Sequence, residues 1–556
     1  MKKIIAVGIL ALGLIACTEK NPPDNGSGTT TPTDTTSVTP TDTTSVTPAD
    51  TTIVTPTDTT IVTSDTIRLT WSGTNVQIEG TNAGVSVKNE NGYVTVNSTV
   101  KDITYILSGN GQGQLTVYGT NRHQLILRDL TLSCSDGPAI NNQCKKSCFV
   151  VLEGTSSLTD GSSYATTDED RKAAFFSEGQ MIFSGSGSLS VKGNYKHAIA
   201  SDDYIQFAES TGSLNLTSAS DGIHANDGVY FDGGTFTITA GSDGVQCDSM
   251  IVFNAGTLTI SAEADGIQSD TASIVINGGS ITITKAGDKG ITAFGDVTVT
   301  DGTVRVTSQY KCIKAGKKEN NKVISAGNIV ISGGDIQCIC TGTSSGNGGG
   351  PGGWPGGWGS DDSSSTPEGI EAKGTITISG GIVYSQSADD AINAGGDLTI
   401  SGGYVCAYST SNDGIDANGN CYIKGGLVFA MGSRDPEVAI DANSEARKKL
   451  YIEGGTIVAV GKLESGAQLT QSCYQASGST KTWYALTVGD EMFAFKTPDS
   501  NASTLVVSGA SKPTLSKGVT ASGTAIFNGR GYYPASVTGG SNVSLSTYSA
   551  SGGGRP

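Results

Sequence analysis

The sequence predicts an all-β protein whose central part is a parallel β-helix, a solenoid in which each repeat forms one coil. Three observations predict this fold. A short phrase, Asp-Gly-Ile-X-Ala in its most complete form, recurs about every 22 residues from Asp221 to Val438. Each phrase is followed by short segments that alternate apolar residues with Thr or Ser, which is typical of half-buried strands. The chain contains 77 glycines in 556 residues and no helical period within the repeats, so we expect tight turns that join strands.

The phrase begins at nine positions that are equivalent in successive repeats. These positions are Asp221, Asp243, Asp265, Lys289, Lys311, Glu368, Asp390, Asp413 and Val438. The third residue of the phrase is Ile or Val, and we expect it to point inward. Because coils of a β-helix stack about 4.8 Å apart, these residues should form one continuous buried ladder, in which each coil covers the apolar face of its neighbour. A second ladder is expected from the pairs Phe236/Ile238, Leu258/Ile260, Ile281/Ile283 and Val304/Val306.

The N-terminal region has the pattern of an exported, anchored protein. Residues 1–16 carry two lysines and then an apolar run that is too short to span a bilayer, which predicts a signal peptide. The segment that ends in Ala16-Cys17 resembles a bacterial lipobox, so Cys17 is the predicted lipidation site and the N-terminal membrane anchor. Residues 17–65 contain four Thr/Pro/Asp-rich octads and predict an extended tether. We therefore expect a lipoprotein at the outer membrane or cell surface.

The remaining chain divides by its periodicity. Residues 66–130 contain an Asn-Gly hairpin signal and predict an N-terminal β cap. The parallel β-helix is expected over residues 131–461, interrupted by a Gly-rich insertion at 341–366. Residues 462–556 lose the period, and we expect a small C-terminal β element that covers the open end.

Acidic residues recur at the turn positions of the repeat, and they predict bound calcium. A single Asp-Gly is an ordinary turn, in which the carboxylate caps local N–H groups. In register on successive coils, however, like charges repel unless a cation neutralises them, and calcium accepts irregular cages of oxygen ligands. The predicted ligands are Asp221, Asp243 and Asp265 in one group, and Glu368, Glu371, Asp389, Asp390, Asn393, Asp413, Asp416 and Asp441 in another. The alternative is a solvated ladder of acidic turns.

The charge of the chain limits its partners. Lys and Arg number 35 and Asp and Glu 52, which gives a net charge of −17 and argues against a nucleic-acid partner. Lys311 and Lys314 interrupt the acidic series. They either keep a loop soluble or form a patch for uronate carboxylates. Trp354 and Trp358 lie in the Gly-rich insertion, where exposed aromatic rings would suit stacking on sugars.

The repeated Asp-Gly-Ile-X-Ala unit, followed by Gly-Gly-Thr/Ser-Ile-Thr-Ile and joined to a glycine-rich insertion, resembles a family of bacterial exported carbohydrate-binding proteins. Their fold is a right-handed β-helix like that of polysaccharide lyases. The resemblance extends from about Asp65 to the C-terminus. It implies calcium and non-catalytic binding of a polysaccharide partner, cellulose-like or uronate-containing.

The sequence leaves two alternative functions open. The first is a calcium-dependent, pectate-type polysaccharide lyase, in which Lys311 or Lys314 would be the base that removes a proton beside the uronate carboxylate. No arginine accompanies these lysines in the repeat, which favours binding over catalysis. The second alternative is a structural adhesin or envelope protein whose acids only cap turns.

Overall fold

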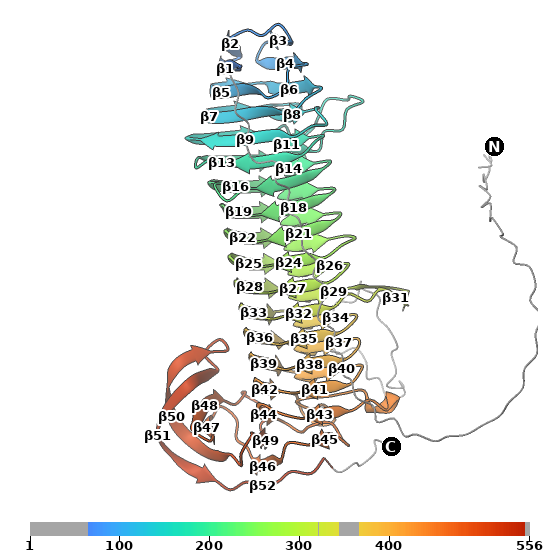
Figure 1. Ribbon diagram of the computed structural model, residues 1–556, viewed down its shortest axis with the longest axis vertical. Coiled ribbons are helices and arrows are strands. Elements are labelled where there is room, and N and C mark those ends of the chain that lie inside the picture. The colour runs from blue at the N-terminus through green and yellow to red at the C-terminus, as the bar shows by residue number, and fades with distance from the viewer. Residues whose placement is uncertain (1–64, 321, 344–365, 551–556) are drawn as a thin grey trace, which may run out of the picture. The chain divides into compact units, whose positions relative to one another are not determined.

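The computed structural model describes residues 65–320, 322–343 and 366–550. Within these residues the protein is all-β. Its strands lie coil upon coil in long parallel sheets, and the one helix in this part of the chain is a 3₁₀ turn, η1, at Ser444–Ala446 (Figure 1). The predicted all-β class is therefore confirmed, and the long parallel sheets agree with a solenoid. None of the helical segments among these residues is long and apolar enough to cross a membrane.

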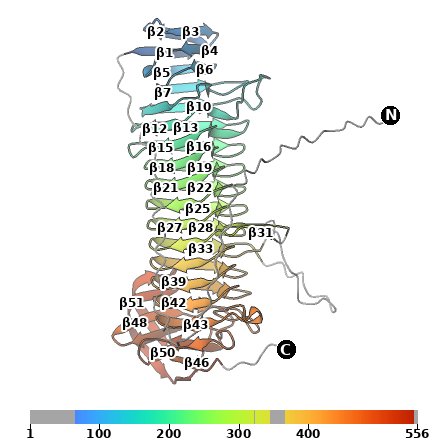
Figure 2. The ribbon, with the colours of Figure 1, turned by 45° about the vertical axis from the view of Figure 1, so that its right-hand side comes forward.

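From residue 140 to residue 431, each coil of the stack supplies one strand to each of three parallel ladders (Figure 2). After one strand in every ladder the chain returns to the first, so that Ile223 pairs with Val245 and Val245 with Ile267. The first ladder, which carries the phrase, consists of β3 (Val85–Glu90), β4 (Tyr93–Ser98), β6 (Gln114–Gly119), β8 (Ile140–Asn142), β11 (Ala173–Ser177), β14 (His197–Ser201), β17 (Ile223–Ala225), β20 (Val245–Cys247), β23 (Ile267–Ser269), β26 (Ile291–Ala293), β29 (Ile313–Ala315), β34 (Ile370–Ala372), β37 (Ile392–Ala394) and β40 (Ile415–Ala417).

The other two ladders form the remaining faces of the stack. The second consists of β9 (Cys148–Glu153), β12 (Met181–Ser184), β15 (Tyr204–Phe207), β18 (Gly228–Phe231), β21 (Met250–Phe253), β24 (Ile274–Ile276), β27 (Val297–Val299), β32 (Ile329–Ile331), β35 (Ile376–Ile378), β38 (Leu398–Ile400), β41 (Cys421–Ile423), β43 (Leu450–Ile452) and β45 (Gln468–Leu469). The third consists of β10 (Thr155–Thr159), β13 (Ser188–Gly193), β16 (Ser213–Ser218), β19 (Thr235–Ala240), β22 (Thr257–Ala262), β25 (Ser280–Ala286), β28 (Thr303–Ser308), β33 (Asp335–Cys340), β36 (Ile382–Ser387), β39 (Tyr404–Ser409), β42 (Leu427–Met431) and β44 (Thr456–Val460).

The core runs through the stack and is made of the predicted ladders. The inward Ile or Val of each phrase pairs with its equivalent on the next coil and is buried from Ile223 to Ile440. The pairs Phe236/Ile238 and Leu258/Ile260 are likewise in register and buried. A glycine precedes each third-ladder strand, often as Gly-Gly, and this has a steric cause. At Gly403, for example, φ is +74° and a Cβ would lie 2.7 Å from Gly380 O on the preceding coil.

Shortening one residue of the inward ladder tests how tightly the coils pack. Ile392 is fully buried between Ile370 and Ile415. We expect Ile392→Val to lower the free energy of unfolding by about 0.5–1.5 kcal/mol, because one buried methyl group is removed and the coils cannot close the gap completely. Thr399→Ala, on the outward side of the same coil, should change it by less than about 0.5 kcal/mol. Equal effects of the two variants in urea unfolding would contradict this account of the core.

Antiparallel strands close the N-terminal end of the stack. β1 (Thr66–Gly73) pairs antiparallel with β2 (Asn75–Glu79), and β3 with β4 through the turn at Asn91 and Gly92, both of which have positive φ. The hairpin expected at this Asn-Gly is therefore present. Two long strands, β5 (Ile103–Gln112) and β7 (His123–Ser133), then continue the stack in parallel, and β7 pairs with both β9 and β10.

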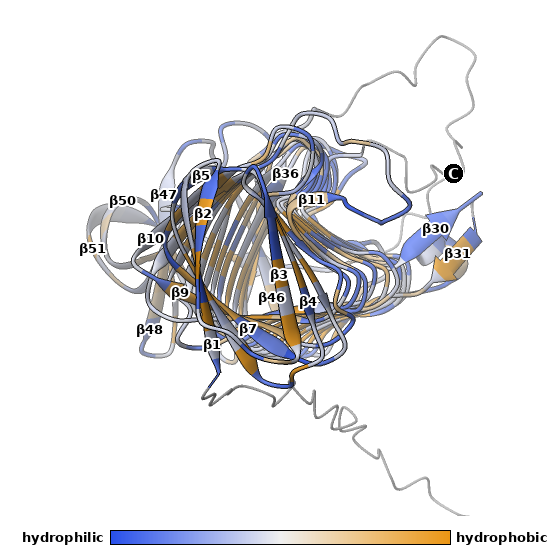
Figure 3. Ribbon diagram, turned by 90° about the horizontal axis from the view of Figure 1, so that it is seen from above, coloured by the Kyte–Doolittle hydropathy of each residue, from blue (hydrophilic) through white to orange (hydrophobic). Residues whose placement is uncertain are grey.

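The C-terminal region contains two different elements. The last coil is covered by the antiparallel strands β49 (Thr504–Ser508), β46 (Cys473–Ser477) and β52 (Ser546–Thr547). A closed barrel packs against the flank of the stack (Figure 1), where its Tyr484 and Phe493 share a core with Tyr384 and Phe429 of the third ladder. The barrel consists of β47 (Trp483–Val488), β48 (Glu491–Lys496), β51 (Gly531–Val543) and β50 (Thr514–Ile526). One further hairpin, β30 (Lys317–Glu319) with β31 (Lys322–Ser325), projects from the side of the stack (Figure 3).

Candidate functional site

The candidate site is the column formed by the first residue of each phrase from Asp221 to Asp413, which we call the turn column. Most of these residues are the repeated aspartates. Their first role is to join one coil to the next. Asp221 Oδ1 accepts a hydrogen bond from the backbone N–H of Asp243 (3.2 Å), and Asp243 Oδ1 accepts one from Asp265 N (2.8 Å). Asp390 Oδ1 does the same for Asp413 N (3.1 Å). Each carboxylate therefore caps the equivalent residue of the following coil, which explains why the acid recurs in register.

Stacking also brings like charges together in the first part of the column. Burial, followed by the neighbouring charges of Asp265 and Asp221, raises the pKa of Asp243 to about 7. Burial also raises the pKa of Asp265 to about 6, although the ammonium of Lys289 opposes the shift. A carboxylate resists ionisation where it has lost water and faces other acids. These two side chains would gain from a cation.

Lysines neutralise the middle of the column from inside. Lys311 is only 2% exposed, and its Nζ lies 2.9 Å from Glu368 Oε2 and 3.6 Å from Glu371 Oε2. The same ammonium donates to the carbonyl (2.9 Å) and hydroxyl (2.7 Å) oxygens of Thr366. Lys314, also buried, is in register with Glu371 and donates to Gly316 O (3.1 Å). Both lysines are thus enclosed by protein groups, whereas a surface patch for uronates requires exposed ones.

A hollow of about 160 Å³ opens beside these lysines. Its polar lining includes Asp265, Gln268, Asp270, Lys289 and Lys314. It lies where the acidic first part of the column meets the basic middle. Both signs of charge are therefore available to one small group bound there.

The second predicted group is also brought together, on the last coils of the first ladder. Asn393 donates to Glu368 Oε1 (3.0 Å) and Asp390 Oδ2 (3.3 Å), and Asp416 is in register with Asn393. Asp441 follows Ile440, which bridges to Ile415. We call this set the acidic cluster; its members are Asp389, Asp390, Asn393, Asp413, Asp416 and Asp441.

The acidic cluster carries more negative charge than the protein neutralises. Burial and the neighbouring Asp416, Asp389, Glu368 and Asp413 raise the pKa of Asp390. Burial raises the pKa of Asp416 to about 6 and, together with a hydrogen bond to Glu464 and the charge of Asp413, that of Asp441 to about 9. Among the described residues, no lysine or arginine forms an ion pair with Asp390, Asp416 or Asp441. Asp441 Oδ1 is buried without a hydrogen-bond partner there. Its oxygen ligands are of the type that a hard cation such as calcium accepts, although among the described residues no three of its carboxylates have ligand atoms that all lie within 4.8 Å of one another.

Three residues that contact the turn column or the acidic cluster were not predicted as site residues. Glu464 joins the acidic cluster because Leu463 bridges to Ile440 one coil earlier; the phrase is unrecognisable there, so the sequence gives no signal. His197 and His224 meet at Asp221. In the described part of the chain, these three form the one group of His, Cys, Asp or Glu side chains whose ligand atoms all lie within 4.8 Å of one another. Aligning the faint phrase at His197 with that at Asp221 would have predicted the contact.

Three predicted site residues lie outside the described residues. They are Cys17, Trp354 and Trp358.

A comparison with known families identifies the family of the chain. A family model described as "Carbohydrate-binding domain-containing protein" matches the chain over residues 90–293 and 288–412, more than half its length. The matched residues include most of the turn column but end before Asp413, Asp416 and Asp441. No curated protein matches the chain. Among solved structures, the chain is similar to a "polysaccharide lyase-like protein from C. thermocellum, Gadolinium derivative", with 20% identity and a TM-score of 0.30, over 50% of this chain and 95% of that one.

Proposed function

Because the chain belongs to the family of carbohydrate-binding domain-containing proteins, we propose that it binds plant-type polysaccharide, cellulose-like or uronate-containing, along the side of a right-handed parallel β-helix. The observation that carries this proposal is the in-register stacking of the coils, which repeats the turn column and the outward residues of the first ladder from coil to coil. A polysaccharide is itself a repeating chain. The partly exposed outward residues of this ladder, such as Gln268, Thr292 and Asn393, repeat along coils that lie about 4.8 Å apart and can contact several sugar units at once.

The hollow beside Asp265 and Lys289 supports the uronate-containing class. The Lys289 ammonium bonds to Asp288 at 2.6 Å, and a uronate carboxylate would compete for this cation, because charge-assisted hydrogen bonds are the strong ones. A neutral, cellulose-like chain would rely on hydroxyl contacts to Gln268 and Asp270 in the same lining. The two classes of glycan therefore differ in how strongly salt should weaken binding.

The proposal includes calcium that stabilises the protein or bridges it to the glycan. The acidic cluster would hold the ion through Asp390, Asp413, Asp416 and Asp441, and a second ion would lie beside Asp243 and Asp265. When bound, calcium would supply the positive charge that these carboxylates lack and would leave coordination positions for glycan oxygens. The buried, unpaired Asp441 Oδ1 supports this assignment.

We also propose that the protein is exported and anchored at the outer membrane or cell surface through a lipid on Cys17. The tether of residues 17–65 would then hold the binding face away from the bilayer. The signal pattern, the lipobox and the octads support this part of the proposal.

Retention of the full chain on insoluble cellulose and on polygalacturonate, in calcium and in chelator, tests the function. We expect retention that calcium strengthens, with no unsaturated product in the ultraviolet absorbance of the supernatant. Product that disappears in Lys311→Ala or Lys314→Ala, while the variant stays folded, would instead identify a lyase. Neither retention nor product on a panel of plant glycans would favour a structural adhesin.

The tryptophans of the Gly-rich insertion provide a narrower prediction. We expect Trp354→Ala combined with Trp358→Ala to weaken glycan retention about tenfold, since aromatic stacking is worth about 0.5–1.5 kcal/mol per ring and 1.4 kcal/mol is a factor of ten. The matched control is Ser363→Ala with Ser364→Ala, in the same insertion. Undiminished affinity of the tryptophan variant in a depletion assay would remove the insertion from the binding surface.

A further inference from the structure

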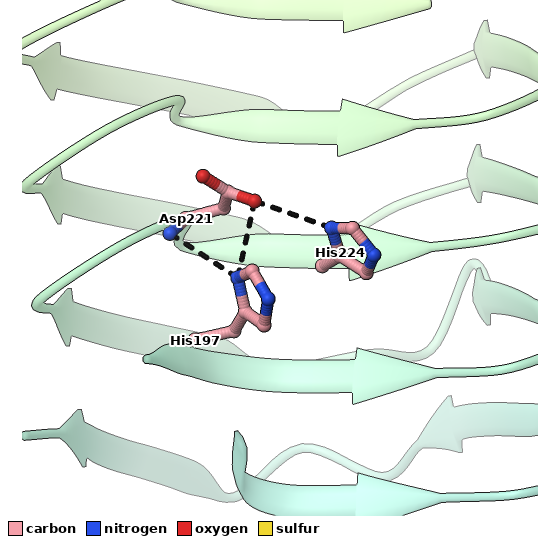
Figure 4. A group of neighbouring side chains, drawn as sticks. All are labelled: His197, Asp221 and His224. Atoms are coloured by element: carbon pink, nitrogen blue, oxygen red, sulfur yellow. Dashed lines mark hydrogen bonds and ion pairs between the residues drawn. The ribbon is translucent and has the colours of Figure 1, made fainter. Parts of the chain in front are cut away.

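Two histidines from adjacent coils converge on one carboxylate oxygen of an aspartate. His197 begins β14, Asp221 lies in the turn before β17, and His224 is the central residue of β17. His197 Nδ1 lies 3.1 Å and His224 Nδ1 3.2 Å from the same Asp221 Oδ2 (Figure 4). The imidazole rings are stacked, with centroids 4.3 Å apart and planes at 19°. Both rings therefore present the same nitrogen to the same oxygen. His197 Nδ1 also accepts a hydrogen bond from the backbone N–H of Asp221 (3.3 Å), which an ion bound at that nitrogen would replace.

We propose that His197, Asp221 and His224 bind a divalent transition-metal ion, with zinc as the best match. Zinc bonds to nitrogen and oxygen are about 2.0–2.2 Å long, so ligand atoms of a tetrahedral site lie roughly 3.3 Å apart. The two nitrogen–oxygen distances are close to that separation. Imidazole nitrogens suit zinc, copper and nickel, whereas calcium takes oxygen ligands. The sequence predicts calcium at Asp221 as part of an acidic ladder. With two histidines beside it, Asp221 is better suited to a transition metal.

The surroundings hold the carboxylate in a ligand orientation. Asp221 Oδ1 accepts hydrogen bonds from Asp243 N (3.2 Å) and the Ser220 hydroxyl (3.3 Å), which turns Oδ2 toward the two imidazoles. Such outer hydrogen bonds fix the orientation of metal ligands. The side chains of His197 and Asp221 are 9% and 8% exposed, and that of His224 is 18% exposed. The site is therefore enclosed but reachable from His224.

An ion at this site would have two consequences. It would link the coil that contains β14 to the coil that contains β17, whose strands already pair at Ile199 and Ile223. Three protein ligands also leave a fourth position of a tetrahedral ion for water or for an oxygen of a bound molecule. The competing interpretation is a carboxylate that only accepts hydrogen bonds from the two imidazoles.

Metal titration of the full chain, after treatment with chelator, distinguishes these interpretations. We expect one zinc ion to bind per chain in calorimetry, cobalt(II) to give visible absorption bands at the same site, and a hundredfold excess of calcium not to displace either ion. His224→Gln should weaken zinc binding more than tenfold. This variant should fold, because Gln246 and Gln268 occupy the equivalent positions of the next two coils.

The control is Asp227→Asn, which removes an exposed carboxylate from the turn after β17 and should leave zinc affinity unchanged. His197→Asn provides a second ligand variant, and the thermal transition of each variant reports its folding. Zinc affinity that is unchanged in both histidine variants, displacement of zinc by calcium, or the absence of stoichiometric binding would overturn the proposal and leave the hydrogen-bonded triad.

Discussion

Replacing Lys311 by methionine is expected to lower the free energy of unfolding by about 3–5 kcal/mol, the range observed when one partner of a buried ion pair is removed. Burial opposes the charge on Lys311, yet the carboxylates of Glu368 and Glu371 outweigh it and raise the pKa of this lysine. The ammonium contacts both carboxylates and donates to Thr366. Methionine fills a similar volume but leaves the two acids without this cation. Urea unfolding of the purified variant measures the loss.

The double variant Lys311→Met, Glu368→Gln is the matched control. Removing both charges of a buried pair is often close to neutral, because neither group is then left uncompensated. We therefore expect the second substitution to restore a large part of the lost stability. Glu368→Gln alone should not make the protein more stable than the wild type. A Lys311→Met protein as stable as the wild type would show that the ammonium is not needed within the stack. In that case a role at the surface, including that of a base, would regain support.

The coil repeat was predictable because its physical cause is local and periodic. A short strand on a buried stack alternates between inward and outward residues, and Ile392 is an inward one. The spacing between successive phrases fixes which residue it meets on the next coil. The in-register position of Asp243 over Asp221 follows from the same count. The hydrogen bond that each carboxylate accepts from the next coil does not follow, since a turn aspartate can equally well cap its own loop.

The state of each charged group depends on contacts that the repeat does not encode. Lys311 looks like a solvated lysine in the sequence, but the coil beyond the Gly-rich insertion brings Glu368 and Glu371 over it. Glu464 reaches Asp441 after the phrase has disappeared. The barrel covers the outward side chain of Tyr384 through contacts with residues more than 100 positions away, such as Arg530. Long-range pairing of this kind requires the three-dimensional fold.

Calcium is expected to stabilise the protein, and Asp390→Asn is expected to reverse its effect. An ion that binds only the folded state adds about 2.7 kcal/mol to the free energy of unfolding at a concentration one hundred times its dissociation constant. In chelator, the carboxylate of Asp390 is buried among other acids, so the neutral amide should make the variant more stable than the wild type. In calcium the order should invert, because the variant has lost a ligand. Asparagine keeps the oxygen that accepts the Asp413 N–H.

The thermal midpoint, measured in chelator and across a calcium titration, tests this inversion. Asp301→Asn removes one negative charge from an exposed turn outside the turn column and controls for the net charge of −17. We expect that control to respond to calcium as the wild type does. Equal calcium responses of Asp390→Asn and the wild type would place any calcium elsewhere. A variant less stable than the wild type in chelator would mean that the carboxylate contributes more through the hydrogen bond that Oδ2 accepts from Asn393, which an amide nitrogen cannot accept, than it costs through repulsion. The acidic cluster would then need no ion.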